Sequence, residues 1–118
     1  MLNLRLEEVK GYDGGLTSKV YVKLVKVKNE VVLAICDEDI LGKTFEDKEK
    51  GLKIEVKEVF YKGFKMELED SISLFEKASI INLVGEKIVG RAVKKGFIKP
   101  SGIIWIAGIP HAQLIKMR

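Results

Sequence analysis

Cysteine, histidine and proline are scarce in this 118-residue sequence, which contains one cysteine, one histidine and two prolines. A single cysteine excludes an intramolecular disulfide framework, and a lone thiol is typical of a reducing cytoplasm. One histidine leaves few ligands for a transition metal, so neither a metal nor a cofactor is expected. No apolar run approaches the roughly 20 residues of a transmembrane helix, and no secretory signal opens the chain. These absences predict a cytoplasmic protein without a membrane partner.

Amide side chains and arginine are also rare. The sequence holds 3 Asn and 1 Gln, and its 21 basic residues include only 3 Arg. Few amides and many lysines are a trend of hyperthermophilic proteins, although an AT-rich genome also favours lysine. The hydrophobic fraction of 47% is that of a globular domain of ordinary composition. We therefore expect one folded domain with a thermophile-like composition.

Charge is distributed unevenly along the chain. Residues 1–29 carry a net charge of +3, residues 30–81 carry −5, and residues 82–118 carry +6. A basic C-terminal third favours an anionic partner such as RNA. The same charge also suits pairing with the acidic middle of the folded chain. Nothing in this pattern predicts an oligomeric state.

Apolar alternation predicts strands in two parts of the chain. Residues 20–28 and 31–36 are the clearest strands, joined by a tight turn at Asn29 and Glu30, and residues 52–56 form a third. Strands at 103–107 and 112–117 close the chain on either side of a turn at residues 108–110. Leu2, Leu4 and Leu6 alternate as well, so residues 1–19 are an N-terminal extension or an extra strand. Residues 20–118 then form a single domain.

Between these strands the apolar period becomes helical. A first helix is predicted from Asp70, and a second from Ser79 that ends at Gly96. The second helix would turn Ile81, Val84, Ile88 and Ala92 inward. The resulting order, β-β-β-α-α-β-β, predicts an α+β fold. Its largely antiparallel sheet would have about five strands, with two helices packed on one face.

A stripe of cations follows the outer side of the second predicted helix. Its members are Lys87, Arg91, Lys94 and Lys95. Such a face can follow phosphates and give a salt-dependent affinity for nucleic acid, and Phe97 just beyond it could stack on a base. Alternatively, these cations are only the solvated side of an amphipathic helix and bind no partner.

Two glycines interrupt the same helical pattern, at positions 85 and 90. Their spacing differs from the Gly-x-x-Gly loop with which KH modules clamp RNA. The alternative interpretation is close packing of Gly85 and Gly90 against the sheet. The segment Gly42-Lys43-Thr44 likewise lacks the leading glycine of a phosphate-binding loop, so nucleotide hydrolysis is not expected.

Polar residues at strand ends offer a second type of site. Cys36 is followed by three acidic residues, which would raise the pKa of its thiol and oppose a nucleophilic role. A pairing of Cys36 with His111 requires the two strand ends to meet. His111 and Gln113 lie two positions apart and would share one face of a strand, where they bind a ligand or satisfy buried backbone groups.

Three sequence blocks resemble an archaeal family, domain-of-unknown-function family 424. They are residues 36–45 (CDEDILGKTF), 82–86 (NLVGE) and 108–113 (GIPHAQ), and the similarity runs from about Val20 to Met117. The resemblance implies an archaeal cytoplasmic protein and supplies no catalytic mechanism. The polar residues of these blocks form a candidate ligand site if they converge: Asp37, Glu38, Lys43, Thr44, Asn82, Glu86, His111 and Gln113.

These observations favour a non-enzymatic binding module for RNA or a ribonucleoprotein. The basic helix face would contact phosphates, and the turn around His111 would add selectivity. The alternative is a small-ligand-binding protein or enzyme with a polar site around Cys36, Lys43, Glu86 and His111. A third possibility is a protein-interaction adaptor, for which an exposed patch around Phe60, Tyr61 and Phe64 would be the sign.

Overall fold

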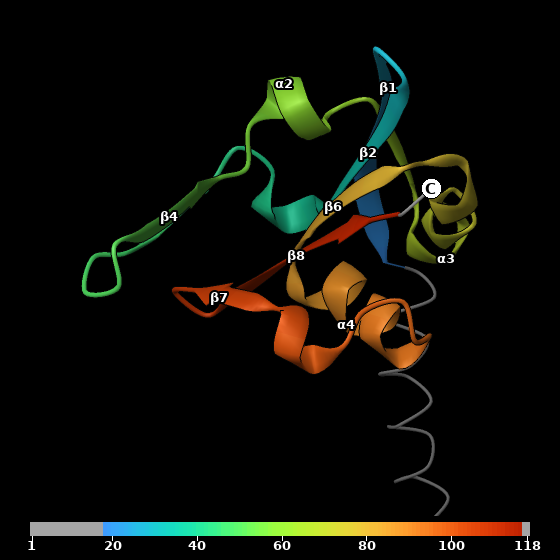
Figure 1. The fold of residues 1–118 in the computed structure, drawn as a ribbon. Helices are drawn as coiled ribbons and strands as arrows, with labels where there is room; N and C mark the ends of the chain where they lie inside the picture. The colour runs from blue at the N-terminus through green and yellow to red at the C-terminus, as the bar shows by residue number, and fades with distance from the viewer. Residues whose placement is uncertain (1–17, 117–118) are drawn as a thin grey trace, which may run out of the picture.

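A computed structural model describes residues 18–116, and a six-stranded sheet forms its centre (Figure 1). The strand order is β5-β1-β2-β6-β8-β7. Strands β2 and β6 run parallel, and the other neighbours in this sheet run antiparallel. The strands are β1 (Lys19–Val27), β2 (Glu30–Asp37), β5 (Phe64–Glu67), β6 (Ile80–Val84), β7 (Ile104–Ile106) and β8 (Ile109–Ile115).

Two further strands form an arm outside this sheet. Strands β3 (Thr44–Asp47) and β4 (Leu52–Glu55) pair antiparallel and project from the body of the protein (Figure 1). Short helical elements connect the strands, and α4 is the longest of them at nine residues. They are the 3-10 turns η1 (Glu38–Ile40), η2 (Phe75–Lys77) and η3 (Pro100–Gly102), and the helices α2 (Glu58–Tyr61), α3 (Leu68–Ile72) and α4 (Glu86–Lys94).

The first predicted hairpin is confirmed as β1 and β2. Val25 pairs with Val32 and Val27 with Glu30 in a continuous antiparallel ladder. The turn lies one residue earlier than expected, because Lys28 rather than Asn29 takes the left-handed conformation, with φ of +57°. The apolar strand β2 lies between β1 and β6, as expected for a strand that is apolar on both faces.

The prediction of a second helix from Ser79 is wrong for residues 79–85, about two turns at 3.6 residues per turn. Residues 80–84 form β6, which pairs with β2 on one side and β8 on the other. A short apolar run fits either period, and the hydrogen bonds of two neighbouring strands outweigh a weak local preference for helix. Gly85 then ends the strand and α4 begins at Glu86.

The first predicted helix is also shorter than expected, and the sheet is larger. The chain after Asp70 completes α3 at Ile72 and then forms the separate turn η2. The main sheet has six strands rather than about five, and β2 and β6 form a parallel pair that the prediction did not include. The predicted strand at residues 52–56 becomes β4, in the arm instead of the main sheet. The α+β class itself is confirmed.

Helices cover one face of the main sheet. Ile88, Val89 and Ala92 of α4 and Phe75 of η2 are buried there against the sheet. The sheet contributes Val20, Val22, Leu33, Ile35, Ile81 and Leu83, each at most 1% exposed. This helix-covered face holds the larger of the two apolar clusters, so it is the main core of the domain.

The opposite face is covered only at one end. There η1, α2 and the base of the arm bury Cys36 and Val84 together with Ile40, Val56 and Tyr61. One row further along lie Lys23, Ala34, Asn82 and Gln113, and beyond it a row of apolar side chains, Val25, Val32, Ile80 and Ile115. Val25 and Ile115 at its two ends are 39% and 60% exposed. We call these two rows the open face.

Two further predictions concern an N-terminal strand and the absence of a transmembrane helix. The strand predicted from Leu2, Leu4 and Leu6 lies outside the described residues. Within residues 18–116, no helix is long and apolar enough to cross a membrane.

Candidate nucleic-acid interface

Helix α4 is preceded by a glycine that the fold requires. Gly85 has φ of +122° and ψ of +149°, a combination that is accessible almost only to glycine. A Cβ atom at this position would lie 2.3 Å from Cγ of Asp37. Gly85 therefore lets the carboxylate of β2 approach the start of α4. Gly90 differs, because a Cβ there would meet no atom within 4 Å, so the expected close packing holds for Gly85 only.

The carboxylate of Asp37 caps the first turn of α4. Its Oδ2 accepts a hydrogen bond from the Lys87 amide at 2.8 Å, and its Oδ1 accepts one from the Ile88 amide at 3.0 Å. Asp37 is 4% exposed, and burial raises its pKa to about 6, against the two amide hydrogen bonds, which lower it. The end of the helix that attracts anions is therefore already occupied by a side chain of the protein.

The cations of α4 project away from the sheet. Lys87 and Lys94 are exposed on the side of α4 away from the buried Val89 and Ala92, and Lys95, the residue after the helix, is exposed as well. Three of the four residues of the predicted stripe are therefore on the surface, and Arg91 is not. The length of the stripe from Lys87 to Lys94 is about 10 Å at 1.5 Å per residue.

Arg91 has a different environment from the lysines of the stripe. Its side chain is 11% exposed and forms an ion pair with Glu69 of α3. Lys95 Nζ lies 3.7 Å from the other carboxylate oxygen of Glu69. Arg91 thus joins α4 to α3, and one acidic side chain offsets part of the positive charge of the stripe.

Phe97 follows the stripe directly. Gly96, with φ of +85°, turns the chain at the end of α4, and the Phe97 amide donates a hydrogen bond to the Ala92 carbonyl at 2.9 Å. Phe97 is nevertheless 41% exposed as a residue. The expected neighbourhood of cations and an accessible aromatic ring is therefore present at this end of the helix.

Three of the eight predicted ligand-site residues lie on the other side of the sheet. Asn82 and Gln113 are opposite one another on the open face, where Gln113 Nε2 donates to Asn82 Oδ1 at 3.0 Å. His111 lies next along β8, opposite Val84, and is half-buried. Desolvation lowers the pKa of His111, so its imidazole is neutral at neutral pH.

The other five are placed elsewhere. Asp37 points to the helix-covered side as the cap of α4, while Glu38 pairs with Lys65 of β5 at 2.7 Å. Lys43 and Thr44 are exposed at the base of the arm, and Glu86 is exposed in the first turn of α4. The eight residues thus fall into separate groups on both sides of the sheet.

Cys36 and His111 share a face of the sheet but are not neighbours. Strand β6 lies between them, and two strand spacings amount to about 9.5 Å. Burial, followed by the charge of Asp37, raises the pKa of the Cys36 thiol to about 12, which keeps it protonated at neutral pH. Among the described residues, no three His, Cys, Asp or Glu side chains gather as a metal site.

Sequence reasoning misses two roles in this region. It assigns Asp37 to a ligand site rather than to a helix cap, and it does not single out Glu69. The available signal for the cap is a carboxylate at the end of a buried strand combined with a glycine just before a helix. Glu69 has no comparable signal, because its contact with Arg91 depends on how α3 and α4 pack.

The fold and the three sequence blocks define a class of small α+β domains. A family model described as "Protein of unknown function (DUF424)" matches residues 25–117. The chain belongs to this family, which confirms the resemblance given by residues 36–45, 82–86 and 108–113.

A solved structure supports the same assignment. The chain is similar to a protein described as "an uncharacterized conserved protein from Methanopyrus kandleri", an archaeon, with 30% sequence identity. The match covers 81% of this chain and 90% of that one, with a TM-score of 0.66. No curated protein matches the chain.

Proposed function

We propose that this protein is a non-enzymatic module that binds RNA, alone or within a ribonucleoprotein, through the outer face of α4. The observation that carries the proposal is the run of exposed lysines, Lys87, Lys94 and Lys95, that leads into an exposed Phe97. Lys87 and Lys94 lie about 10 Å apart along the helix axis, so they can contact the phosphates of more than one nucleotide. The net charge of +6 over residues 82–118 favours the same type of partner.

The cap at Asp37 limits how an anion can approach. Because the amides of Lys87 and Ile88 already donate to Asp37, a phosphate has no access to those two donors. Contacts to RNA would therefore come from side chains along the helix rather than from its N-terminus. Binding of this type is salt-dependent and has little sequence preference.

The alternative of a small-ligand site or enzyme has less geometric support. It needs Cys36 and His111 in contact, and β6 separates them. It also needs a reactive thiol, whereas burial holds the pKa of Cys36 near 12. We therefore favour the binding module.

A salt titration tests the proposed function. The full chain is titrated with a fluorescent RNA of mixed sequence between 50 and 300 mM salt, together with the single variants K87Q and K94Q. We expect the logarithm of affinity to fall linearly with the logarithm of salt concentration, and each variant to reduce the slope by about 1. Lys53→Gln, on the exposed arm, is the matched control and should leave the slope unchanged. Absence of RNA binding at the lowest salt would overturn the proposal.

A further inference from the structure

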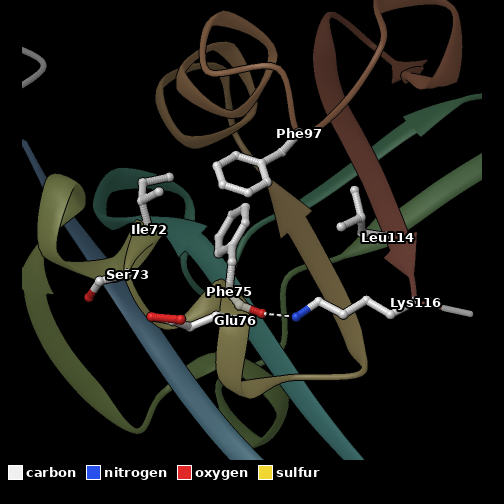
Figure 2. Close-up of a pocket in the computed structure, with 7 residues that line it drawn as sticks. All are labelled: Ile72, Ser73, Phe75, Glu76, Phe97, Leu114 and Lys116. Atoms are coloured by element: carbon white, nitrogen blue, oxygen red, sulfur yellow. Dashed lines mark hydrogen bonds between the residues drawn. The ribbon is translucent and has the colours of Figure 1, made fainter. Parts of the chain in front are cut away.

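A cavity of about 400 Å³ opens beside the end of α4. Its aromatic side is formed by Phe75 of η2 and Phe97, and its aliphatic walls by Ile72 and Leu114 (Figure 2). Lys116 and Glu76 lie at its polar edge. The volume is within the range of about 300–1,000 Å³ that small-molecule sites occupy. The cavity is therefore large enough for one nucleotide-sized group, and it adjoins the proposed RNA-binding face.

Phe97 presents a ring face that Phe75 leaves open. The two ring centroids are 4.9 Å apart, and the rings meet edge to face at 64°. Whichever ring supplies the edge, Phe75 covers at most one face of Phe97. The hydrogen bond from the Phe97 amide to the Ala92 carbonyl fixes the backbone from which this ring projects. A planar group entering the cavity can therefore stack on Phe97 without rearrangement of the backbone.

Lys116 places a cation at the edge of the same cavity. Its Nζ donates a hydrogen bond to the Phe75 carbonyl at 2.6 Å (Figure 2), and an ammonium group has three donors. The Lys116 amide is held in turn by the Ser79 carbonyl at 2.9 Å. In Figure 2 the Glu76 carboxylate points away from Lys116, toward Ser73. An anionic group near Lys116 would therefore meet a fixed positive charge.

We propose that this cavity holds one unpaired base of single-stranded RNA, stacked on Phe97, with a neighbouring phosphate at Lys116. The inference rests on the proposed function and specifies its substrate class. Stacking on an aromatic side chain beside cations is the usual way in which proteins hold single strands, and every base has a face that can stack. Ser73 Oγ, the hydroxyl at the edge, already donates to the Asp70 carbonyl at 2.7 Å, so strong selection for one base is not expected.

The experiment uses the full chain and a short oligouridine that contains one 2-aminopurine, whose fluorescence changes when it stacks. We expect the single strand to bind about tenfold more tightly than a duplex of matched length, with a change in fluorescence. Phe97→Leu keeps the apolar contact with Phe75 but removes the aromatic face, and should lose about tenfold in affinity together with the fluorescence change. Phe64→Ala, an exposed aromatic residue on β5, is the control and should behave like the wild type.

Two further arms separate the possible failures. Lys116→Gln should weaken binding several-fold, and Lys77→Gln, an exposed lysine of η2, should not. Binding that depends on salt but is unchanged by F97L, or equal for single strand and duplex, would overturn this inference and leave the proposed function standing. Absence of any RNA binding by the wild type would overturn both. Equal affinity for the corresponding single-stranded DNA would overturn the restriction to RNA.

Discussion

On the helix-covered face of the main sheet, Leu33, Ile81 and Leu83 are completely buried, whereas the apolar row of the open face ends in the exposed side chains of Val25 and Ile115. The two faces belong to the same strands and have similar numbers of aliphatic residues. They differ in what covers them: α3, α4 and η2 on one side, and on the other only η1, α2 and the base of the arm. The number of aliphatic residues therefore does not decide which face forms the main core. The helices that cover a face decide it.

A matched pair of isoleucine substitutions gives the largest expected difference between the faces. Ile81→Ala empties a completely buried site on the helix-covered face and should lower the free energy of unfolding by about 4 kcal/mol. Ile115→Ala removes the same atoms from an exposed site on the open face and should cost less than about 1 kcal/mol. Urea denaturation of the two variants measures the difference. Equal losses would mean that the open face is buried in solution.

A pair of glycine substitutions tests how the helical layer is attached to the sheet. Gly85→Ala should destabilise the domain by about 3 kcal/mol, because a Cβ would collide with Asp37 and the backbone conformation disfavours alanine. Gly90→Ala, in open space within α4, should instead stabilise it by roughly 0.5–1 kcal/mol. Thermal or urea midpoints of the two variants should therefore move in opposite directions. A tolerated G85A would show that the cap at Asp37 is not tightly packed.

The buried cap should make the stability depend on pH. Burial raises the pKa of Asp37 from its ordinary value of 3.8 to about 6, so the folded protein holds this proton more tightly than the unfolded chain does. The contribution of Asp37 to stability should then fall by about 2 kcal/mol as the pH rises from about 4 to above 6. The check is the difference in unfolding free energy between the wild type and Asp37→Asn across this range. A difference that grows with pH would show that the two amide hydrogen bonds outweigh burial.

The smallest expected effect concerns the contact between α3 and α4. Arg91→Gln removes the ion pair with Glu69 from a site where the arginine is nearly buried, and should cost about 1 kcal/mol. Lys95→Gln removes the longer and more exposed contact with the same carboxylate and should change stability by a few tenths of a kcal/mol. Denaturant midpoints at low and high salt measure both. An equal loss of unfolding free energy in the two variants would show that Lys95 contributes as much as Arg91 to the contact between α3 and α4.

The parts of the fold that sequence analysis predicted are those set by local pattern. The β1–β2 hairpin follows from alternation on both sides of a short turn, and the outward cations of α4 follow from helical spacing. Strand β6 could not be recognised in the same way, because a short segment with four apolar residues and one asparagine fits a helix as well as a strand. Its identity is decided by β2 and β8, which lie far from it in sequence.

The candidate site shows the same limit. The positions of Lys87, Lys94 and Lys95 were predictable from their spacing, and so was the nearness of Phe97 to α4. The pairing of Arg91 with Glu69 was not, because it depends on the packing of two helices. The cavity brings together η2, the chain after α4 and the end of β8, so Phe75, Lys116 and Phe97 meet only in the folded protein.

The parallel pairing of β2 with β6 has a consequence for the time course of folding. Val32 lies beside Ile80, and the whole of the arm, α2, β5 and α3 intervenes in the chain. During synthesis the β1–β2 hairpin leaves the ribosome before residues 80–94, so its inner side chains lack β6 and α4, a large part of their cover, until those residues follow. Closing so long a loop is slow compared with forming a hairpin. We therefore expect this hairpin to be the segment most prone to aggregate in a nascent or truncated chain.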